Sequence, residues 1–366
     1  MSGEIETYIL EEAADAFATE GQMISCERYG SGHINDTFKL SCARPYILQR
    51  MNDDIFKDPV SLMRNIEGVT TFLRQEVIKN GGDPDRETLN LVKTKEGAAF
   101  YVDSLGSYWR MYYFIEGATC YNLVEKPEDF YQSGKAFGHF QRLLSKYPAK
   151  ELSETIPGFH DTPRRFERFK QVVAEDVCRR AGEVQKEIQF VMDRGSDMGL
   201  AMAMLDRGQL PLRVTHNDTK LNNIMIDDRT GEAICIIDLD TVMPGLSIFD
   251  FGDSIRFGAN TAEEDETDLG KVSLSLPLFE IYTKGFLEGC AGSLTEAEVK
   301  MLPQGARLMT LECGMRFLTD YLEGDTYFKV AREKHNLDRC RTQFELVADM
   351  ERKWDGMGKI VDSCLG

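Results

Sequence analysis

Residues 214–240 read VTHNDTKLNNIMIDDRTGEAICIIDLD, and this stretch indicates both a fold and a chemistry. Asp218 lies in a polar loop, and the amide residue Asn223 follows five positions later. Two short apolar runs then flank the turn Arg229-Thr230-Gly231, and the second run ends at Asp238. Apolar runs joined by such a turn predict a β-hairpin. We expect this hairpin to present Asp218, Asn223 and Asp238 around one cleft.

These three side chains suit the transfer of a phosphoryl group. A carboxylate such as Asp218 can orient an attacking hydroxyl and accept its proton, while oxygens of Asn223 and Asp238 can hold Mg²⁺ on a polyphosphate. An isolated aspartate usually caps a helix or lies at the surface, and an Asn-Asn pair usually marks a turn. The ordered set, with apolar strands in the required places, favours the catalytic interpretation.

Residues 216–223, HNDTKLNN, resemble the catalytic loop of the aminoglycoside phosphotransferase/choline kinase superfamily, whose common form is H-G-D-x-x-x-x-N. Asn217 stands where that form usually has glycine. Asp238 matches the superfamily's magnesium aspartate, which is the counterpart of the D-F-G aspartate of protein kinases. The resemblance implies an α+β, bilobal protein-kinase-like fold, with a small antiparallel β N-lobe that carries one helix and a larger, mainly helical C-lobe.

A closer resemblance is to the N-acetylhexosamine 1-kinases. It rests on residues 46–52 (YILQRMN), 55–59 (IFKDP), 216–223 and 237–245 (IDLDTVMPG). Those enzymes pass the γ-phosphoryl group of ATP to the anomeric hydroxyl of N-acetylglucosamine or N-acetylgalactosamine. The resemblance therefore implies ATP as the co-substrate, Mg²⁺ as the cofactor and an N-acetylhexosamine as the small-molecule acceptor.

The composition excludes several classes of protein. The 366-residue chain is 42% hydrophobic and 28% charged, which is ordinary for a globular protein and excludes collagen-like and disordered chains. Its net charge of −18 disfavours duplex nucleic acid and anionic membranes as partners. Nine cysteines without a C-x-x-C pair or zinc-site spacing predict free thiols. With an acidic N-terminus and no long apolar run, we expect a soluble, cytoplasmic protein without an obligate protein partner.

The first third of the chain predicts an antiparallel sheet with one helix. Asp58-Pro59 is a typical helix start, apolar residues then recur at helical spacing over 62–77, and Asn80-Gly81-Gly82 ends the pattern. The expected strands are 23–28, 33–40, 45–51, 88–92, 98–103 and 108–115.

Beyond residue 117 the pattern becomes mainly helical. We expect long helices at 130–144, 164–181 and 183–205, then the β-rich stretch 214–240, then helices to the end. The acidic run 263–268 predicts a solvated loop. The change of character places the domain boundary between a nucleotide-binding lobe, residues 1–116, and a catalytic and acceptor-binding lobe, residues 117–366.

Asp250-Phe251-Gly252 spells D-F-G, but it precedes an apparent helix instead of ending an apolar strand. By resemblance, Asp250 corresponds to a downstream structural aspartate that braces the catalytic loop, and Asp238 is the better metal ligand. For Asp240 and Asp253 a capping or surface role and a functional role stay open. Asp240 could also approach the magnesium ion without binding it directly.

The nucleotide-binding residues follow from the expected lobe. Gly30, Ser31 and Gly32 could fold over phosphates through their backbone N–H groups, and no P-loop motif is present. Strand 45–51 contains no lysine for the α- and β-phosphates. Since neighbouring strand residues face opposite sides, either Arg50 or Gln49 points inward, and we favour Arg50 for its charge. For the remaining nucleotide contacts we expect Glu67 as an ion-pair partner on the following helix, and Tyr113 and Ile115 in the strand and hinge that bear adenine.

The acceptor site is expected in the helical lobe. Arg316 and Asp320 lie one turn apart on one helix face, and Tyr327 follows the break at Gly324. The sugar-kinase resemblance assigns Arg316 and Tyr327 to the hexosamine, although an exposed Arg316–Asp320 ion pair would explain the spacing equally well. His33 at the glycine-rich turn could also reach the sugar. The other candidates, for packing or the surface, are His139, His160 and His335.

These observations predict an ATP- and Mg²⁺-dependent kinase that phosphorylates the anomeric hydroxyl of an N-acetylhexosamine by direct in-line transfer. Two alternatives stay open. One is a kinase of another small acceptor, such as an aminoglycoside, choline or homoserine, and the net charge of −18 suits a cationic acceptor. The other is a nucleotide-binding module without catalytic activity.

Overall fold

The computed structural model describes residues 2–30, 34–121 and 126–365, and the chain folds as two compact units. The first unit comprises residues 1–119, 146–157 and 225–243. The second comprises residues 120–145, 158–224 and 244–366. The first change of unit thus lies three residues beyond the boundary expected at 116. The hairpin that carries Asp238 belongs to the first unit, not with the helical part of the chain.

The first unit contains an antiparallel sheet in the order β1-β2-β3-β6-β4, with β5 also paired to β6. Its strands are β1 (Ser25–Arg28), β2 (Asp36–Ser41), β3 (Tyr46–Arg50), β4 (Leu91–Val92), β5 (Tyr101–Val102) and β6 (Tyr108–Tyr113). β4 and β5 are much shorter than predicted. The reason is that one edge of β6 pairs with β3 while the other edge is divided between β4 and β5.

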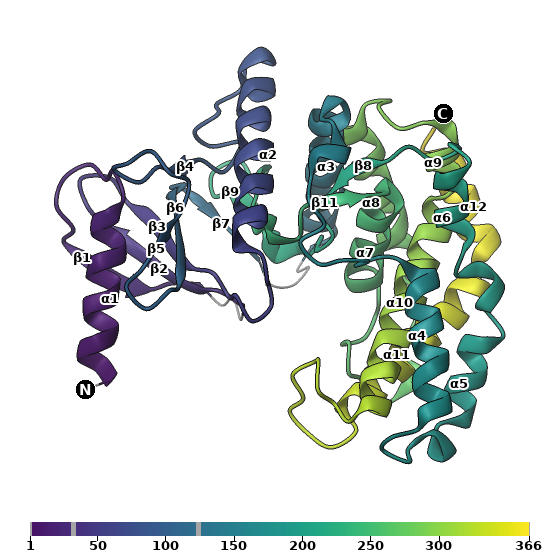
Figure 1. Cartoon of the computed structure of the whole chain (residues 1–366). Helices are drawn as coiled ribbons and strands as arrows, with labels where there is room; N and C mark the ends of the chain where they lie inside the picture. Colours follow the sequence, from purple (N-terminus) through teal and green to yellow (C-terminus); the bar gives the residue numbers. More distant parts are fainter. Residues whose placement is uncertain (1, 31–33, 122–125, 366) are drawn as a thin grey trace. The chain divides into compact units, whose positions relative to one another are not determined.

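Two helices accompany this sheet (Figure 1). α1 (Ser2–Ala16) packs Ile9, Ala13 and Ala14 into a core with buried residues of β2, β3 and β6. α2 (Pro59–Lys79) begins as predicted, because the Asp58 carboxylate accepts a hydrogen bond from the backbone N–H of Ser61. Its buried stripe matches the apolar pattern read from the sequence.

A second small sheet contains the predicted hairpin. Its order is β10-β9-β7, formed by β7 (Ala118–Thr119), β9 (Ile224–Asp227) and β10 (Ala233–Ile236). The turn is stabilised by Asp227, whose carboxylate accepts hydrogen bonds from the N–H groups of Arg229 and Thr230. Gly231 adopts a φ of +71°, which is the left-handed conformation that glycine favours.

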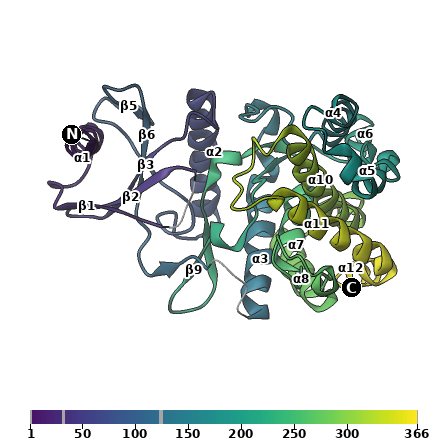
Figure 2. The ribbon, with the colours of Figure 1, turned by 90° about the horizontal axis from the view of Figure 1, so that it is seen from below.

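The second unit is mainly helical (Figure 2). Its elements are α3 (Pro127–Leu143), α4 (Thr162–Glu175), α5 (Gln185–Met192), α6 (Leu200–Asp206), β8 (Arg213–Thr215), β11 (Met243–Gly245), α7 (Ser247–Gly258), α8 (Leu276–Cys290), α9 (Glu296–Lys300), α10 (Leu302–Glu323), α11 (His335–Arg352) and α12 (Trp354–Ser363). β8 pairs with β11, inside which the change of unit falls.

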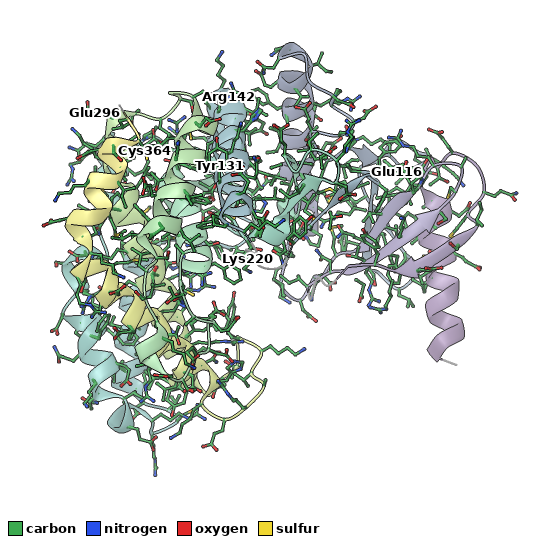
Figure 3. The ribbon with its side chains drawn as sticks, turned by 180° about the vertical axis from the view of Figure 1, so that it is seen from behind. Glu116, Tyr131, Arg142, Lys220, Glu296 and Cys364 are labelled. Atoms are coloured by element: carbon green, nitrogen blue, oxygen red, sulfur yellow. The ribbon has the colours of Figure 1, made fainter. Side chains whose placement is uncertain are left out.

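Helices α3 and α8 cross at close range. Figure 3 marks Tyr131 and Arg142 along α3. Glycines on both helices allow the approach, because a Cβ added at Gly134 or Gly138 would collide with the backbone of α8, and one at Gly285 with the backbone of α3. Helix α3 also contacts the start of the loop 216–223, because Phe137 and Phe140 pack against the ring of His216.

The structure corrects two of the predicted helices. The helix expected at 164–181 ends at Glu175, where Asp176 takes a left-handed conformation with a φ of 40°. The single helix expected at 183–205 is divided into α5 and α6. Gly195 lies in the break, and a Cβ there would lie 2.8 Å from the ring of Phe166, so packing against α4 requires glycine where a continuous helix would disfavour it.

The mixed α+β class with an antiparallel sheet and a helical region is confirmed. None of the helices that the structure describes is long and apolar enough to cross a membrane.

Candidate active site

The loop 216–223 follows β8 and starts with a constrained backbone. Asn217 has a φ of +64°, in the left-handed region that favours glycine and that asparagine tolerates better than most residues. This conformation explains why asparagine can replace the glycine usual at this position. His216 is fully buried beneath the loop, with its ring against Phe137 and Phe140 of α3.

Asp218 presents a partly exposed carboxylate that is held from both sides. Its side chain is 28% exposed, and the Lys220 ammonium lies 2.8 Å from Oδ1. Asn223 Nδ2 donates to Oδ2 at 3.0 Å and to the Asp218 backbone carbonyl at 2.8 Å. The carboxylate is therefore oriented by two neighbours from its own loop while keeping a face toward solvent.

Lys220 was not singled out by sequence reasoning, although its position two residues after Asp218 could have drawn attention to it. Burial favours the neutral amine, but the carboxylates of Asp218 and Asp253 outweigh this effect and raise the pKa of the ammonium. The side chain is 37% exposed and lies at an edge of the helical unit (Figure 3). Lys220 therefore stays protonated beside Asp218, the candidate base.

Asp250 braces the loop, as the resemblance implied. It is fully buried on α7 and accepts hydrogen bonds from the N–H groups of His216 and Asn217, at 3.0 and 2.8 Å, and from the Gln141 amide at 2.8 Å. The D-F-G string lies inside this helix, not before it. Its glycine, Gly252, faces the backbone of Gly305 on α10, where a Cβ would not fit.

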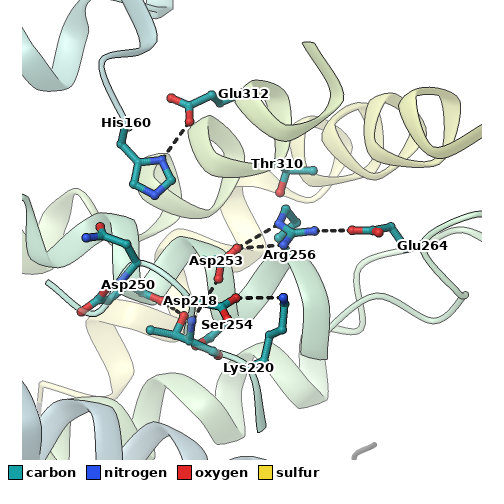
Figure 4. A network of polar contacts seen from close by, with 12 residues as sticks. His160, Asp218, Lys220, Asp250, Asp253, Ser254, Arg256, Glu264, Thr310 and Glu312 are labelled. Carbon is teal, nitrogen blue, oxygen red and sulfur yellow. Dashed lines mark hydrogen bonds and ion pairs between the residues drawn. The ribbon is translucent and has the colours of Figure 1, made fainter. Parts of the chain in front are cut away.

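Asp253 is a second brace, and it is neither a surface residue nor a helix cap. It is buried on α7, accepts a hydrogen bond from the N–H of Thr219 at 3.1 Å, and forms an ion pair with Arg256 at 2.8 Å (Figure 4). Burial favours its protonated form, but Arg256 and Lys220 outweigh this and lower its pKa. Arg256 in turn bonds Glu264 at 2.9 Å.

The acidic run 263–268 is more ordered than a solvated loop. Glu264 pairs with Arg256, Asp265 pairs with Arg332 and His335, and Glu266 pairs with Lys271. A cavity of about 510 Å³ lies beside this segment and includes Thr219 and Leu221 of the catalytic loop in its lining.

In the first unit, Asp238 follows β10 in a left-handed conformation, with a φ of 58°. Two residues later, Asp240 is 3% exposed and forms an ion pair with the buried guanidinium of Arg110 on β6. Asn35 Nδ2 donates to the other Asp240 oxygen at 2.6 Å. Asp240 is therefore a buried structural anchor, and Arg110, whose charge also interacts with Asp238, is a cation that sequence reasoning missed.

The structure places Gln49 and Arg50 on opposite faces of β3, as strand geometry requires. Gln49 accepts a hydrogen bond from Nε of Arg110 at 2.9 Å and donates to Thr37 at 3.0 Å. Arg50 is 47% exposed and pairs with Asp36. Gln49 thus shares a face with Arg110, and hence with Asp240, whereas Arg50 lies on the other face. Which of the two residues contacts the phosphates stays a prediction. The pairing of Gln49 with Arg110 in the β3–β6 register could have drawn attention to Arg110.

Other expected nucleotide residues have local partners. Glu67 pairs with Lys93, not with a β3 residue, at a cavity of about 410 Å³ that Tyr113 also lines. The N–H groups of Tyr113 and Phe114 donate to the carbonyls of Asn90 and Pro45. Among the described hydrogen bonds none engages the N–H of buried Ile115. Gly30 forms a turn with a φ of +76°, while Ser31, Gly32 and His33 lie outside the described residues.

On α10, Arg316 lies among three aromatic rings. Its guanidinium is 5.2 Å from the ring centre of Phe159, 6.0 Å from that of Tyr327 and 5.4 Å from that of Phe328. The structure therefore brings Arg316 and Tyr327 together, as the sugar-site prediction requires.

Asp320 has a different partner from the one its spacing suggested. No ion pair joins it to Arg316 among the described residues. Instead the buried carboxylate accepts hydrogen bonds from the N–H groups of Thr326, Tyr327 and Phe328, at 2.7–2.9 Å, and from the Asn336 amide. Asp320 thus holds the loop that presents Tyr327, which is itself 65% exposed.

The residue types fit a magnesium ion. Asn223 Nδ2 is directed at Asp218, so its amide oxygen remains a hard oxygen donor, as is the carboxylate of Asp238. No group of three or more His, Cys, Asp or Glu side chains suited to a metal occurs in the described parts of the chain.

Comparison with known proteins agrees with this arrangement. The family model described as "Phosphotransferase enzyme family", APH, matches residues 25–272. Three similar solved structures are a microcompartment-associated aminopropanol kinase (15% identity, 96% of this chain and 98% of that chain, TM-score 0.59), an aminoglycoside phosphotransferase from Alicyclobacillus acidocaldarius (11%, 96% and 96%, 0.61) and the amicoumacin kinase hAmiN in complex with AMP-PNP and Ca²⁺ (14%, 94% and 96%, 0.57). At these identities the structures establish the shared fold. The chain therefore belongs to the APH phosphotransferase enzyme family.

Proposed function

We propose that this protein transfers the γ-phosphoryl group of ATP directly to the anomeric hydroxyl of an N-acetylhexosamine, N-acetylglucosamine or N-acetylgalactosamine. The observation that carries the phosphoryl-transfer assignment is the arrangement at Asp218. A partly exposed carboxylate is oriented by Asn223, stands beside a protonated lysine and rests on a buried brace. A structural aspartate would not need this exposure.

Each residue of the loop has a role in the proposed reaction. Asp218 orients the acceptor hydroxyl and accepts its proton, which contributes about 10²–10⁴-fold to the rate in typical enzymes. Lys220 supplies positive charge beside the group being transferred. Asn223 and Asp238 would hold the magnesium ion, which when bound neutralises charge on the ATP phosphates. In the first unit, Gln49 would contact the ATP phosphates, the buried Arg110 guanidinium orients its amide, and Ile115 is available to adenine.

The hexosamine assignment rests on the motif resemblance and is supported by the charge around Arg316. Arg165 is a second guanidinium close to Arg316. Burial and the positive charge of Arg316 lower the pKa of Arg165, and the carboxylate of Glu312 only partly opposes this effect. Two guanidinium groups with aromatic rings favour a neutral, polar acceptor such as an N-acetylated sugar. An ammonium-bearing acceptor would meet like charges at this surface.

The alternative of an amino-alcohol or aminoglycoside kinase has support from the names of relatives, such as the aminopropanol kinase. The guanidinium groups of Arg316 and Arg165 oppose this alternative, because they would repel the ammonium group of such an acceptor. A module without catalytic activity is opposed by the presence of Asp218, Asn223 and Asp238 together.

A panel assay tests the proposal. ATP consumption with Mg²⁺ should be measured with N-acetylglucosamine, N-acetylgalactosamine, choline, homoserine, aminopropanol and kanamycin. We expect turnover with one or both N-acetylhexosamines, and phosphorus NMR should show the product phosphate on the anomeric carbon. Turnover only with choline, aminopropanol or kanamycin would overturn the hexosamine assignment.

A further inference from the structure

His160 carries an unexplained polar atom in the second unit. Its Nδ1 lies 2.8 Å from Oε1 of Glu312, while Nε2 is buried and has no hydrogen-bond partner. The sequence predicts a packing or surface role for His160, but leaving a buried polar atom unpaired costs about 1–3 kcal/mol. A polar ring kept for packing alone would not retain this cost, so Nε2 calls for a partner.

Two aromatic rings pack against the imidazole of His160. The ring of Phe159 meets it edge-on with centres 4.5 Å apart, and the ring of Phe249 lies 5.2 Å away. Figure 4 shows the ring beneath Glu312, with the opposite nitrogen turned toward the side of the catalytic loop and Asp253. The ring therefore has one orientation, and Nε2 is its one unsatisfied group.

Glu312 determines which nitrogen carries the proton. Glu312 is 1% exposed, accepts a hydrogen bond from Thr162, and lies 3.7 Å from Arg165. Burial favours its neutral form, but the charges of His160 and Arg165 outweigh this and lower its pKa. An ionised carboxylate only accepts hydrogen bonds, so Nδ1 donates to Glu312, and Nε2 is the ring nitrogen left for another partner.

His160 also adjoins both parts of the proposed site. Glu312 lies one helical turn before Arg316 on α10, and Phe159 contacts both His160 and the Arg316 guanidinium. On the other side, the charge of His160 acts on Asp253, the residue that holds the N–H of Thr219 in the catalytic loop. Through Phe159 and Asp253, His160 therefore neighbours both the residues assigned to the acceptor and the catalytic loop.

We propose that His160 binds a hydroxyl group of the acceptor through Nε2, and that Glu312 is the positioning residue that orients the ring. This inference rests on the proposed kinase function and sharpens it. An acceptor that places a hydroxyl here, in addition to the reacting one, must be polyhydroxylated, as sugars are and as simple amino alcohols are not.

The experiment compares two substitutions that separate the ring nitrogens. In His160→Asn the amide replaces Nδ1 and can still donate to Glu312, but nothing reaches the position of Nε2. In His160→Gln the longer amide reaches the position of Nε2. With the acceptor that the wild-type enzyme uses, we expect His160→Asn to raise the acceptor KM about tenfold, the value of one hydrogen bond, and to leave the KM of ATP unchanged. His160→Gln should recover part of the loss.

Two further measurements separate binding from structure. Glu312→Ala should raise the acceptor KM and Glu312→Gln should restore it, because the amide oxygen still accepts from Nδ1. Nitrogen-15 NMR of the imidazole should show an Nε2 signal that shifts when acceptor is added, and His139→Asn, a substitution of a half-buried histidine on α3, should leave the acceptor KM unchanged.

The outcomes distinguish this inference from the function on which it rests. Wild-type enzyme that phosphorylates nothing in the panel would remove the function itself. Active enzyme whose His160→Asn variant keeps the acceptor KM within twofold, with no NMR shift on addition of acceptor, would overturn the role of His160 alone and leave an ordered water as the partner of Nε2. If His160→Asn folds poorly, the comparison of His160→Gln with wild type and the NMR shift decide the question.

Discussion

Asp218 and Asp253 lie 35 positions apart in sequence and act on the same loop. They differ in how exposed their carboxylates are and in the groups that these carboxylates bond. Asp218 is partly exposed and held by Lys220 and Asn223, which are its neighbours along the chain. Asp253 is buried and engages Arg256 and the backbone of Thr219. The first arrangement keeps a carboxylate available for a proton, and the second uses a carboxylate to hold a backbone in place. Activity and stability should therefore separate cleanly between the two residues.

The largest effect is expected at Asp218. Asp218→Asn should reduce kcat by about 10²–10⁴-fold, since the amide cannot accept the proton of the acceptor hydroxyl. The side chain is partly exposed, so the free energy of unfolding should change by less than about 0.5 kcal/mol. Steady-state kinetics and urea unfolding measure the two quantities. Turnover close to that of the wild type would contradict the role of Asp218.

Asp253→Asn, in contrast, should lower the free energy of unfolding substantially. Among the described residues it leaves the buried Arg256 with Glu264 as its one ion-pair partner, and breaking a buried pair costs about 3–5 kcal/mol. Urea unfolding should show a loss near the lower end of this range. Asp36→Asn is the matched control, because it breaks two pairs that are more exposed, with Arg28 and Arg50, and should cost less than about 1 kcal/mol. Equal losses in the two variants would remove the contrast between buried and exposed carboxylates.

The dependence of stability on pH sharpens the same contrast. The folded-state pKa of Glu312 lies below its usual 4.5, so the ionised form stabilises the fold above that pH, and this contribution is lost as pH falls through the folded-state pKa. The difference in unfolding free energy between wild type and Glu312→Gln should be greatest near pH 7 and shrink below about pH 4.5. A difference that is constant from pH 7 to pH 3 would show that the charge of Glu312 contributes nothing.

The smallest effect concerns the two candidate phosphate residues of β3. Gln49→Ala removes an acceptor from Arg110 and should raise the KM of ATP a few-fold, about the effect of one hydrogen bond. Arg50→Ala breaks an exposed pair and should change it by less than twofold. The comparison is made under identical conditions of Mg²⁺ and salt. A larger effect from Arg50→Ala would restore the sequence-based preference for Arg50.

The elements that sequence reasoning predicted well are those determined by residues close together in the chain. α2 starts at a local cap and follows a local apolar stripe, and the turn at 229–231 is closed by the carboxylate of Asp227. Asp218, Lys220 and Asn223, whose side chains contact one another, also lie within six residues of the chain. That Asp238 joins this loop in one cleft stays a prediction.

The errors occur where distant segments compete for the same residue. Helix 183–205 is interrupted because Gly195 must pack against Phe166 of α4, and β4 and β5 are short because both pair with one edge of β6. Arg110 escaped notice because it lies in a strand of aromatic residues, 130 positions from its partner Asp240. None of these partners can be identified from local periodicity.

The sequence alone thus identified the family and the antiparallel and helical parts, and predicted Asp218 as the reacting carboxylate, because each depends on short patterns of spacing and polarity. Only the tertiary structure decided which polar groups are buried and with whom they pair. It turned Asp240, Asp253 and Asp320 from candidate ligands or surface residues into anchors, and His160 from a packing residue into a candidate contact. The physical reason is that the free energy of a charged or polar side chain depends on its burial and on its partners, and in a folded chain both are supplied by residues far away in sequence.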